Sequence, residues 1–163
     1  MKRRKFLKAG LAGAVVSGAA LAAPAVHAAE KFRWKMTTSF PPGLPFYQSG
    51  PGSAEWIVKQ IDEATDGRLK IKLFAAGELV KWNGGFDAVT GGTVEANSAV
   101  AYYWSGKAPA LQYFGTVPFG MTFQGQNAWY YHGGGLELWN EIYNDFGVIG
   151  MPCGNSGVQM TGW

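Results

Sequence analysis

A strand–helix–strand pattern near the amino-terminal end constrains the fold more than any other feature. Residues 32–38 alternate apolar and polar side chains, which is typical of a strand. In residues 54–64 apolar side chains recur at three- and four-residue spacing, as in an amphipathic helix that follows Ser53 as its N-cap. Residues 69–73 alternate again. This order is a βαβ unit, so we expect an α/β fold with two parallel strands and a right-handed crossover.

The loop after the first strand is a candidate binding position. The strand ends in Thr-Thr-Ser and runs into Phe40-Pro41-Pro42-Gly43. This segment can form neither a helix nor a paired strand, because proline has no backbone N–H to donate. Ligands of α/β proteins often bind at the carboxyl ends of strands. Residues 94–100 are predicted as a third strand that leads into three adjacent aromatic residues, 102–104. At least one of them should line a cleft, and we favour Tyr103, whose phenol could reach a carboxylate or carbonyl oxygen.

The last ten residues predict the wall of a small polar site. Residues 148–151 are expected to form a short buried strand, which Pro152 ends. Glycines then alternate with the carboxamides Asn155 and Gln159. Carbonyl oxygens suit a hard cation, and N–H donors suit a carboxylate. A glycine-rich turn between two elements is the alternative that this pattern by itself leaves open.

Residues 1–28 are predicted to be an export signal. A basic segment, residues 2–8, contains the twin arginine Arg3-Arg4 followed by Phe-Leu-Lys. The apolar stretch after it is too short and too weakly hydrophobic for a membrane span, which argues against an N-terminal anchor helix. Small residues at 26 and 28 place cleavage near Ala28, so we expect a periplasmic protein exported by the twin-arginine pathway.

Removal of this signal reverses the sign of the net charge. The chain has 14 Lys+Arg and 11 Asp+Glu, a formal charge of +3. Five basic residues leave with residues 1–28 and every acidic residue stays, so the mature charge is 9 − 11 = −2. The remaining basic residues form no stripe, so we expect no nucleic-acid partner.

Cys153 is the only cysteine, which excludes an intrachain disulfide. Together with His132 it could form a nucleophilic pair in a secreted enzyme, but no local motif supports this, and we expect a small buried thiol at a strand end. The sequence contains no Walker A loop, GxSxG, HExxH or paired-cysteine metal motif, which weighs against catalysis.

A series of short motifs follows Thr38-Ser39-Phe40 along the chain. They are Ala64–Ile71, Phe74–Val80, Phe86–Val89, Gly92–Glu95, Tyr102–Lys107, Val117–Gly120, Tyr131–Gly135 and Gly154–Met160. In this order they resemble the solute-binding subunit of tripartite ATP-independent periplasmic (TRAP) transporters. The resemblance is to the branch that binds 2-oxo acids and related hydroxy acids.

The resemblance implies a two-lobed α/β periplasmic binding protein that closes on its ligand around a hinge. Residues 29–163 then correspond to its N-terminal part, mostly the first lobe plus the first crossing strand, with the C-terminal half absent. The implied function is periplasmic capture of a small carboxylate, such as pyruvate or a hydroxy acid, with delivery to the TRAP membrane subunits. It implies no enzyme, and a homodimer is possible for the full-length protein.

The resemblance also implies roles for individual residues. Asn155 would hydrogen-bond the ligand, and Gln159 would coordinate a Na⁺ or Ca²⁺ ion. From the first lobe the substrate would be contacted by Phe40, Ser98, Ala99, Val100 and Tyr103, with Tyr102 as the substitute for Tyr103. A Thr is usual where Ser156 stands, and Lys81-Trp82-Asn83 replaces a Pro-containing stretch. The rival function is the binding protein of an ATP-driven importer with the same fold.

Overall fold

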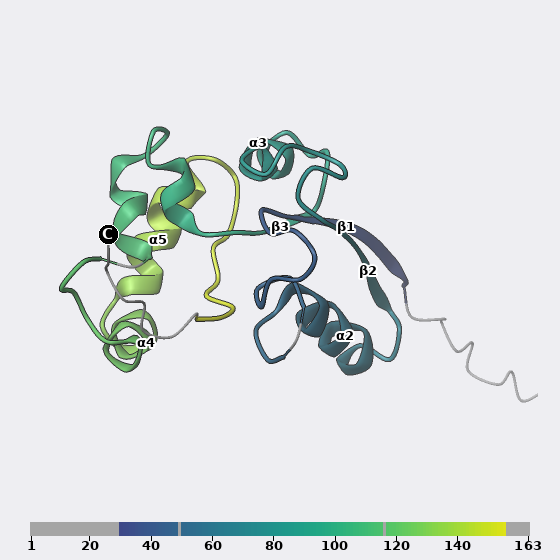
Figure 1. The fold of residues 1–163 in the computed structure, drawn as a ribbon, viewed down its shortest axis with the longest axis horizontal. Helices are drawn as coiled ribbons and strands as arrows, with labels where there is room; N and C mark the ends of the chain where they lie inside the picture. The colour runs from purple at the N-terminus through teal and green to yellow at the C-terminus, as the bar shows by residue number, and fades with distance from the viewer. Residues whose placement is uncertain (1–29, 49, 116, 156–163) are drawn as a thin grey trace, which may run out of the picture.

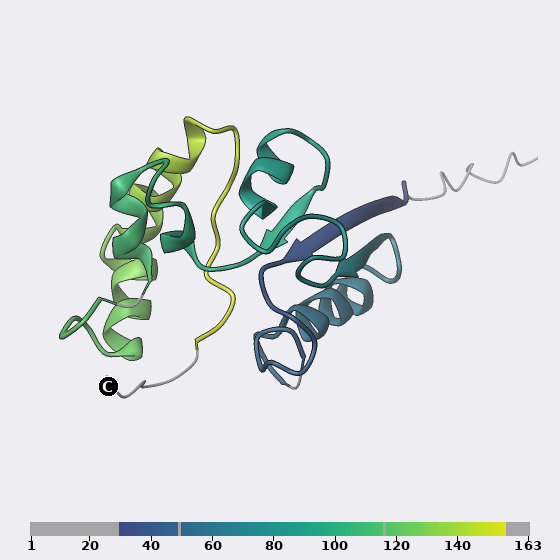
Figure 2. The ribbon, with the colours of Figure 1, turned by 45° about the horizontal axis from the view of Figure 1, so that its top comes forward.

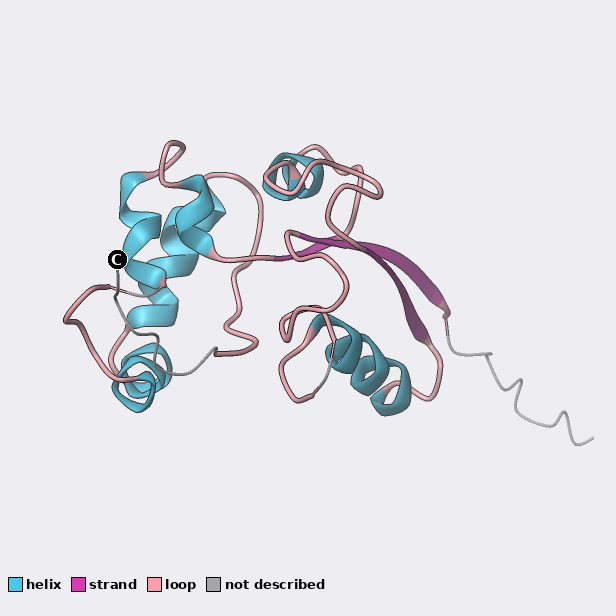
Figure 3. Ribbon diagram, in the orientation of Figure 1, coloured by secondary structure: helices cyan, strands magenta, loops and turns pink. Residues whose placement is uncertain are grey.

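The computed structural model describes residues 30–48, 50–115 and 117–155, so the predicted export signal and Gln159 lie outside the described residues. The elements follow in the order β1 (Phe32–Thr38), α2 (Ala54–Ala64), β2 (Leu69–Phe74), α3 (Gly85–Thr90) and β3 (Ala96–Ser98). Two 3₁₀ helices, η2 (Ala101–Trp104) and η3 (Pro109–Phe114), precede α4 (Phe123–His132) and α5 (Gly135–Asn144). Strands and the two last helices occupy different parts of the molecule (Figure 3).

The strands form one parallel sheet with the order β2-β1-β3. Phe32 pairs with Leu69 at the start of β1, and Met36 pairs with Ala96 near its end. Helices α2 and α3 lie on opposite sides of this sheet (Figure 1 and Figure 2). The predicted βαβ unit is therefore confirmed, and the third predicted strand is present but shorter than expected.

Local signals in the sequence explain the position of α2. The Ser53 hydroxyl accepts a hydrogen bond from the Trp56 N–H (3.3 Å), which satisfies one of the donors that the first turn leaves open. Gly67 lies past the end of the helix with a φ of +71°, a conformation that costs glycine little. The chain then turns directly into β2.

The helical part of the chain, which comprises η2, η3, α4 and α5, has an aromatic core. It contains the buried side chains of Phe86, Trp104, Leu111, Phe114, Tyr130, Trp139 and Tyr143. The Phe114 and Trp139 rings stack with their centroids 5.5 Å apart, and the Tyr130 hydroxyl donates to the Phe114 carbonyl (2.8 Å). Phe86 comes from α3, so this core also attaches the helical part to the sheet. Tyr130 comes from α4, and Trp139 and Tyr143 come from α5.

The prediction of a buried strand over residues 148–151 is wrong. The segment runs from the helical part back toward the sheet (Figure 1), but it belongs to no strand, and Ile149 and Met151 are 75% and 73% exposed. The physical reason lies at Gly150. Its N–H donates to Asn140 Oδ1 (2.7 Å) and its carbonyl accepts from Asn140 Nδ2 (3.1 Å), so a side-chain amide takes the place of a neighbouring strand.

Within the described residues, no helix has the length and apolar character that crossing a membrane requires.

Candidate functional site

The carboxyl ends of β1 and β3 form the centre of the candidate site. Because the two strands are parallel neighbours, their ends lie at the same edge of the sheet. Thr38 Oγ1 and the Ser39 N–H both donate to the Ser98 carbonyl, at 2.9 and 3.0 Å. Thr38 Oγ1 also accepts from the Phe40 N–H (3.2 Å). These bonds bring two predicted site segments, Phe40 and Ser98–Val100, together at one position.

Phe40 is fixed by its own packing. Its ring stacks on Phe46 with centroids 4.8 Å apart, and only 9% of the residue is exposed. Its carbonyl accepts from the Ala76 N–H (3.2 Å), which ties the loop after β1 to the loop after β2. The ring therefore forms a rigid part of the edge of the sheet.

The segment after β3 is helical. The exposure of its aromatic side chains therefore follows from a helix and not from the two faces of a strand. Residues 101–104 form the 3₁₀ helix η2, whose period of three residues buries Ala101 and Trp104 in the core. Tyr103 is half-buried and Tyr102 is exposed. The alternation of a strand, on which the prediction of Tyr103 rests, does not apply at these positions.

Tyr103 is suited to donate a hydrogen bond. Burial, and after it the neighbouring Tyr102, raises the pKa of the Tyr103 phenol above its ordinary value, so the hydroxyl keeps its proton at neutral pH. The Tyr103 ring lies edge-on to Trp82 with centroids 5.2 Å apart. Trp82 is thereby placed beside the predicted site residues.

The segment after α5 reaches this edge of the sheet at residues 153–155. Its backbone lies against Gly52, in the loop that enters α2: a Cβ at Gly52 would be 2.9 Å from the Cys153 carbonyl oxygen. Asn155 follows directly and is exposed. The structure thus brings the predicted residues Phe40, Ser98, Ala99 and Val100 to the same edge, with Tyr103 beside Trp82 and Asn155 at the end of the segment that crosses to it.

Cys153 does not have the environment that we expected. The residue is exposed rather than buried at a strand end, and its thiol shares a hydrogen bond with Ser98. Although the residue is exposed, the protein around the sulfur raises the pKa of the thiol, and the bond with Ser98 partly offsets this. A nucleophilic cysteine has a lowered pKa, so this environment is the opposite of activation. His132 ends α4 on the helical side of the molecule.

Alkylation is expected to report this raised pKa. At about pH 8, iodoacetamide should modify Cys153 several-fold more slowly in the folded protein than in urea, because the folded thiol is less ionised at the same pH. The neutral thiol stabilises the fold below the unfolded pKa, and this contribution is lost as the pH rises through the folded pKa. Ser98→Ala should slow the reaction further. Faster alkylation of the folded protein would contradict this assignment.

Three residues at this site were not singled out as site residues by the sequence. The Ser39 hydroxyl donates to the Trp82 carbonyl (2.6 Å), Trp82 is 52% exposed, and Gly52 contacts the segment after α5. Ser39 could have been found from its place at the end of a strand. The role of Trp82 depends on a loop conformation for which the local sequence carries no signal.

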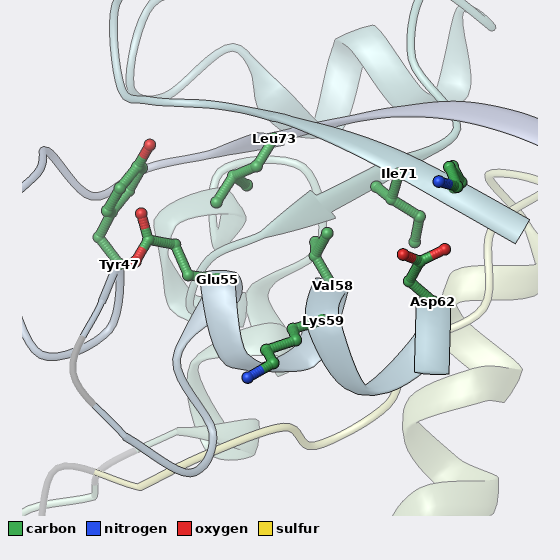
Figure 4. A pocket seen from close by; sticks show the side chains of 8 residues that line it. Tyr47, Glu55, Val58, Lys59, Asp62, Ile71 and Leu73 are labelled. Atoms are coloured by element: carbon green, nitrogen blue, oxygen red, sulfur yellow. The ribbon is translucent and has the colours of Figure 1, made fainter. Parts of the chain in front are cut away.

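A pocket between α2 and β2 lies away from these residues. Tyr47 and Glu55 lie at one end and Asp62 at the other, with Val58 and Leu73 between them (Figure 4). Asp62 Oδ1 is buried there without a hydrogen bond. Within the described residues, no three His, Cys, Asp or Glu side chains are grouped so that they could hold a metal ion.

Comparison with known proteins identifies the family. The family model described as "Bacterial extracellular solute-binding protein, family 7" matches residues 50–163. The chain belongs to this family. The resemblance inferred from the motifs is confirmed, and the family is one of transport proteins that bind solutes outside the cytoplasm.

Relatives of this family 7 protein are known in sequence and in structure. It is 48% identical over 131 residues to a monocarboxylate 2-oxoacid-binding periplasmic protein of Nostoc sp., which covers 80% of this chain and 35% of the relative. A TRAP periplasmic solute-binding protein of Pseudoalteromonas atlantica, solved with bound sodium and pyruvate, is 40% identical with a TM-score of 0.76. The match covers 82% of this chain and 40% of that one.

A third relative is a TRAP transporter solute-binding protein of Bordetella bronchiseptica. It is 38% identical with a TM-score of 0.75, over 82% of this chain and 39% of that one, and it was solved as a dimer with calcium and picolinate. These structures confirm the α/β fold of the solute-binding proteins. The family 7 chain spans well under half the length of each of the three relatives.

Proposed function

We propose that the protein captures a small 2-oxo monocarboxylate in the periplasm, together with Na⁺ or Ca²⁺, and delivers it to TRAP transporter membrane subunits. The observation that carries this proposal is the overlay of 82% of the chain on a relative solved with sodium and pyruvate. The edge of the sheet where Phe40, Ser98 and the segment before Asn155 meet supports it, since this is where α/β proteins bind ligands.

The chemistry of the proposed site residues fits a carboxylate and a hard cation. The Tyr103 phenol, protonated at neutral pH, and the Asn155 amide would donate to carboxylate or keto oxygens. Gln159 would offer its side-chain oxygen to the cation, as oxygen ligands suit Na⁺ and Ca²⁺. Binding that favours the closed over the open form would shift the protein toward the form that docks on the membrane subunits.

Two further parts of the proposal concern export and assembly. We propose that residues 1–28 are a twin-arginine signal, because Arg3-Arg4 is followed by Phe-Leu-Lys, and that the mature protein starts near residue 29. The dimer of the Bordetella relative supports a homodimer for the mature protein. The family places the protein among solute-binding proteins, and we propose that it has no catalytic activity.

Thermal melting tests the proposed function. The mature full-length protein would be melted with pyruvate, other 2-oxo acids, lactate and mandelate, each with and without Na⁺ or Ca²⁺. At about a hundredfold excess over its dissociation constant, a true ligand adds about 2.7 kcal/mol of stability. We expect a cation-dependent rise in melting temperature with a 2-oxo acid. No rise with any carboxylate would reject the proposal.

Gln159→Ala is expected to remove the cation dependence of this rise. Without the side-chain oxygen the cation loses a ligand, so the stabilisation by carboxylate plus cation should fall from about 2.7 kcal/mol toward zero, while the unliganded protein melts as before. Gln112→Ala is the matched control, because Gln112 is exposed on η3 and should leave the rise unchanged. An unaltered cation response in Gln159→Ala would exclude Gln159 as a ligand.

A further inference from the structure

An open pocket borders the candidate site on the side of Trp82. Its volume is ≈ 480 Å³, and it is lined by Ser39, Pro41, Ala76, Gly77, Lys81 and Trp82. Ser39 and Trp82 belong to both places: Ser39 precedes Phe40 and bonds to the Ser98 carbonyl, and Trp82 contacts the Tyr103 ring. A ligand held by the site residues could therefore extend into this pocket without crossing the protein.

The walls of this pocket suit an apolar group. Pro41, Ala76 and the indole of Trp82 present carbon surface. The one hydroxyl, that of Ser39, already gives its proton to the Trp82 carbonyl (2.6 Å), so it has none to donate to a ligand. Lys81 is exposed, and a solvated ammonium adds little binding energy to an anion. The pocket therefore favours a hydrocarbon side chain over a second carboxylate.

Trp82 is held in place from two sides but keeps its ring accessible. Ser39 fixes its carbonyl, and the next carbonyl, that of Asn83, accepts from Trp104 Nε1 (3.3 Å) in the aromatic core. The Trp82 ring meets Tyr103 edge-on with an interplanar angle of 82°, yet 52% of the residue is exposed. A rigid, half-exposed indole offers area to a ligand at little cost in conformational entropy.

We propose that Trp82 and the pocket beside Ser39 form a subsite for the side chain of the ligand. The protein would then prefer 2-oxo acids with a branched or aromatic side chain to pyruvate, and Trp82 would set this preference. This inference rests on the proposed function, because it assumes that the carboxylate is bound beside Ser98 and Asn155. It adds which side chain of the ligand the protein selects.

The test compares the dissociation constants of pyruvate and 4-methyl-2-oxopentanoate by calorimetry on the mature full-length protein. We expect the branched acid to bind at least about tenfold more tightly, as apolar contacts of this size allow. In Trp82→Ala the ratio should fall to within about twofold of one. Trp82→Phe should give an intermediate ratio.

Trp56→Ala is the matched control, because Trp56 is 40% exposed on α2 and lines neither pocket. It should leave the ratio unchanged. A wild-type preference for pyruvate, or an unchanged ratio in Trp82→Ala, overturns the subsite and leaves the proposed function standing. A preference for 2-oxopentanedioate that Lys81→Ala abolishes also overturns it. Binding of neither acid rejects the proposed function and this inference with it.

Discussion

Replacing Trp139 with alanine is expected to lower the free energy of unfolding by about 4 kcal/mol, as for large aromatic side chains removed from a core. Trp139 is 8% exposed and contacts rings from three different elements. Its ring centroid lies 5.5 Å from Phe114 and 5.6 Å from both Tyr130 and Tyr143. A cavity at this position would also remove the surface on which Gly150 packs, since a Cβ there would already meet the indole at 2.9 Å.

Urea denaturation measures this effect through the midpoint at constant slope. The control is Leu138→Ala, one residue earlier on α5, where the side chain is 51% exposed and its removal should cost less than about 0.5 kcal/mol. Equal losses for the two variants would show that α5 does not present Trp139 to a buried core.

Gly52→Ala is expected to lower the free energy of unfolding by roughly 2–4 kcal/mol and to weaken ligand binding as well. Gly52 has a φ of +88°, which is strained for alanine, and its Cβ would lie 2.9 Å from the Cys153 carbonyl oxygen and 3.1 Å from Gly154 Cα. Both of these neighbours are backbone atoms, so relief of the clash must move the chain. Residues 153–155 would shift away from the carboxyl end of β3.

Gly92→Ala separates the strain from the clash. Gly92 also has a positive φ, +70°, but a Cβ there would meet nothing within 4 Å. We expect Gly92→Ala to cost about 1 kcal/mol and to leave the binding of 2-oxo acids unchanged. Melting with and without ligand gives both quantities for each variant. Identical behaviour of the two variants would mean that the contact between Gly52 and Gly154 does not hold Asn155 in place.

Local signals in the sequence were sufficient for the framework that positions the site. Ser53 and Gly67 mark the ends of α2, and the alternation in residues 69–73 predicts β2, because caps and side-chain periodicity act within a few residues. Parallel strands then follow from the βαβ order, and this brings Phe40 and Ser98 to one edge of the sheet. The order of the motifs was specific enough to identify the family.

Long-range contacts decided what the local patterns could not. Val148–Met151 has the composition of a strand, but Asn140 satisfies both backbone groups of Gly150, so no strand forms there. The alternation of a strand predicts an available Tyr103, whereas the 3₁₀ helix η2 and the aromatic core determine its exposure. Cys153 was expected to be buried, and it is exposed because the segment that carries it crosses over the surface toward Gly52.

The sequence by itself therefore determined the βαβ framework, the family and the edge of the sheet where a ligand is expected. Only the tertiary structure decided which side chains surround that edge, and it added Ser39, Trp82 and Gly52. The physical reason is the range of the interactions. Caps and periodicity depend on neighbours in the chain, whereas the bond from Ser39 to Trp82 and the contact of Gly52 with Gly154 join residues 43 and about 100 positions apart.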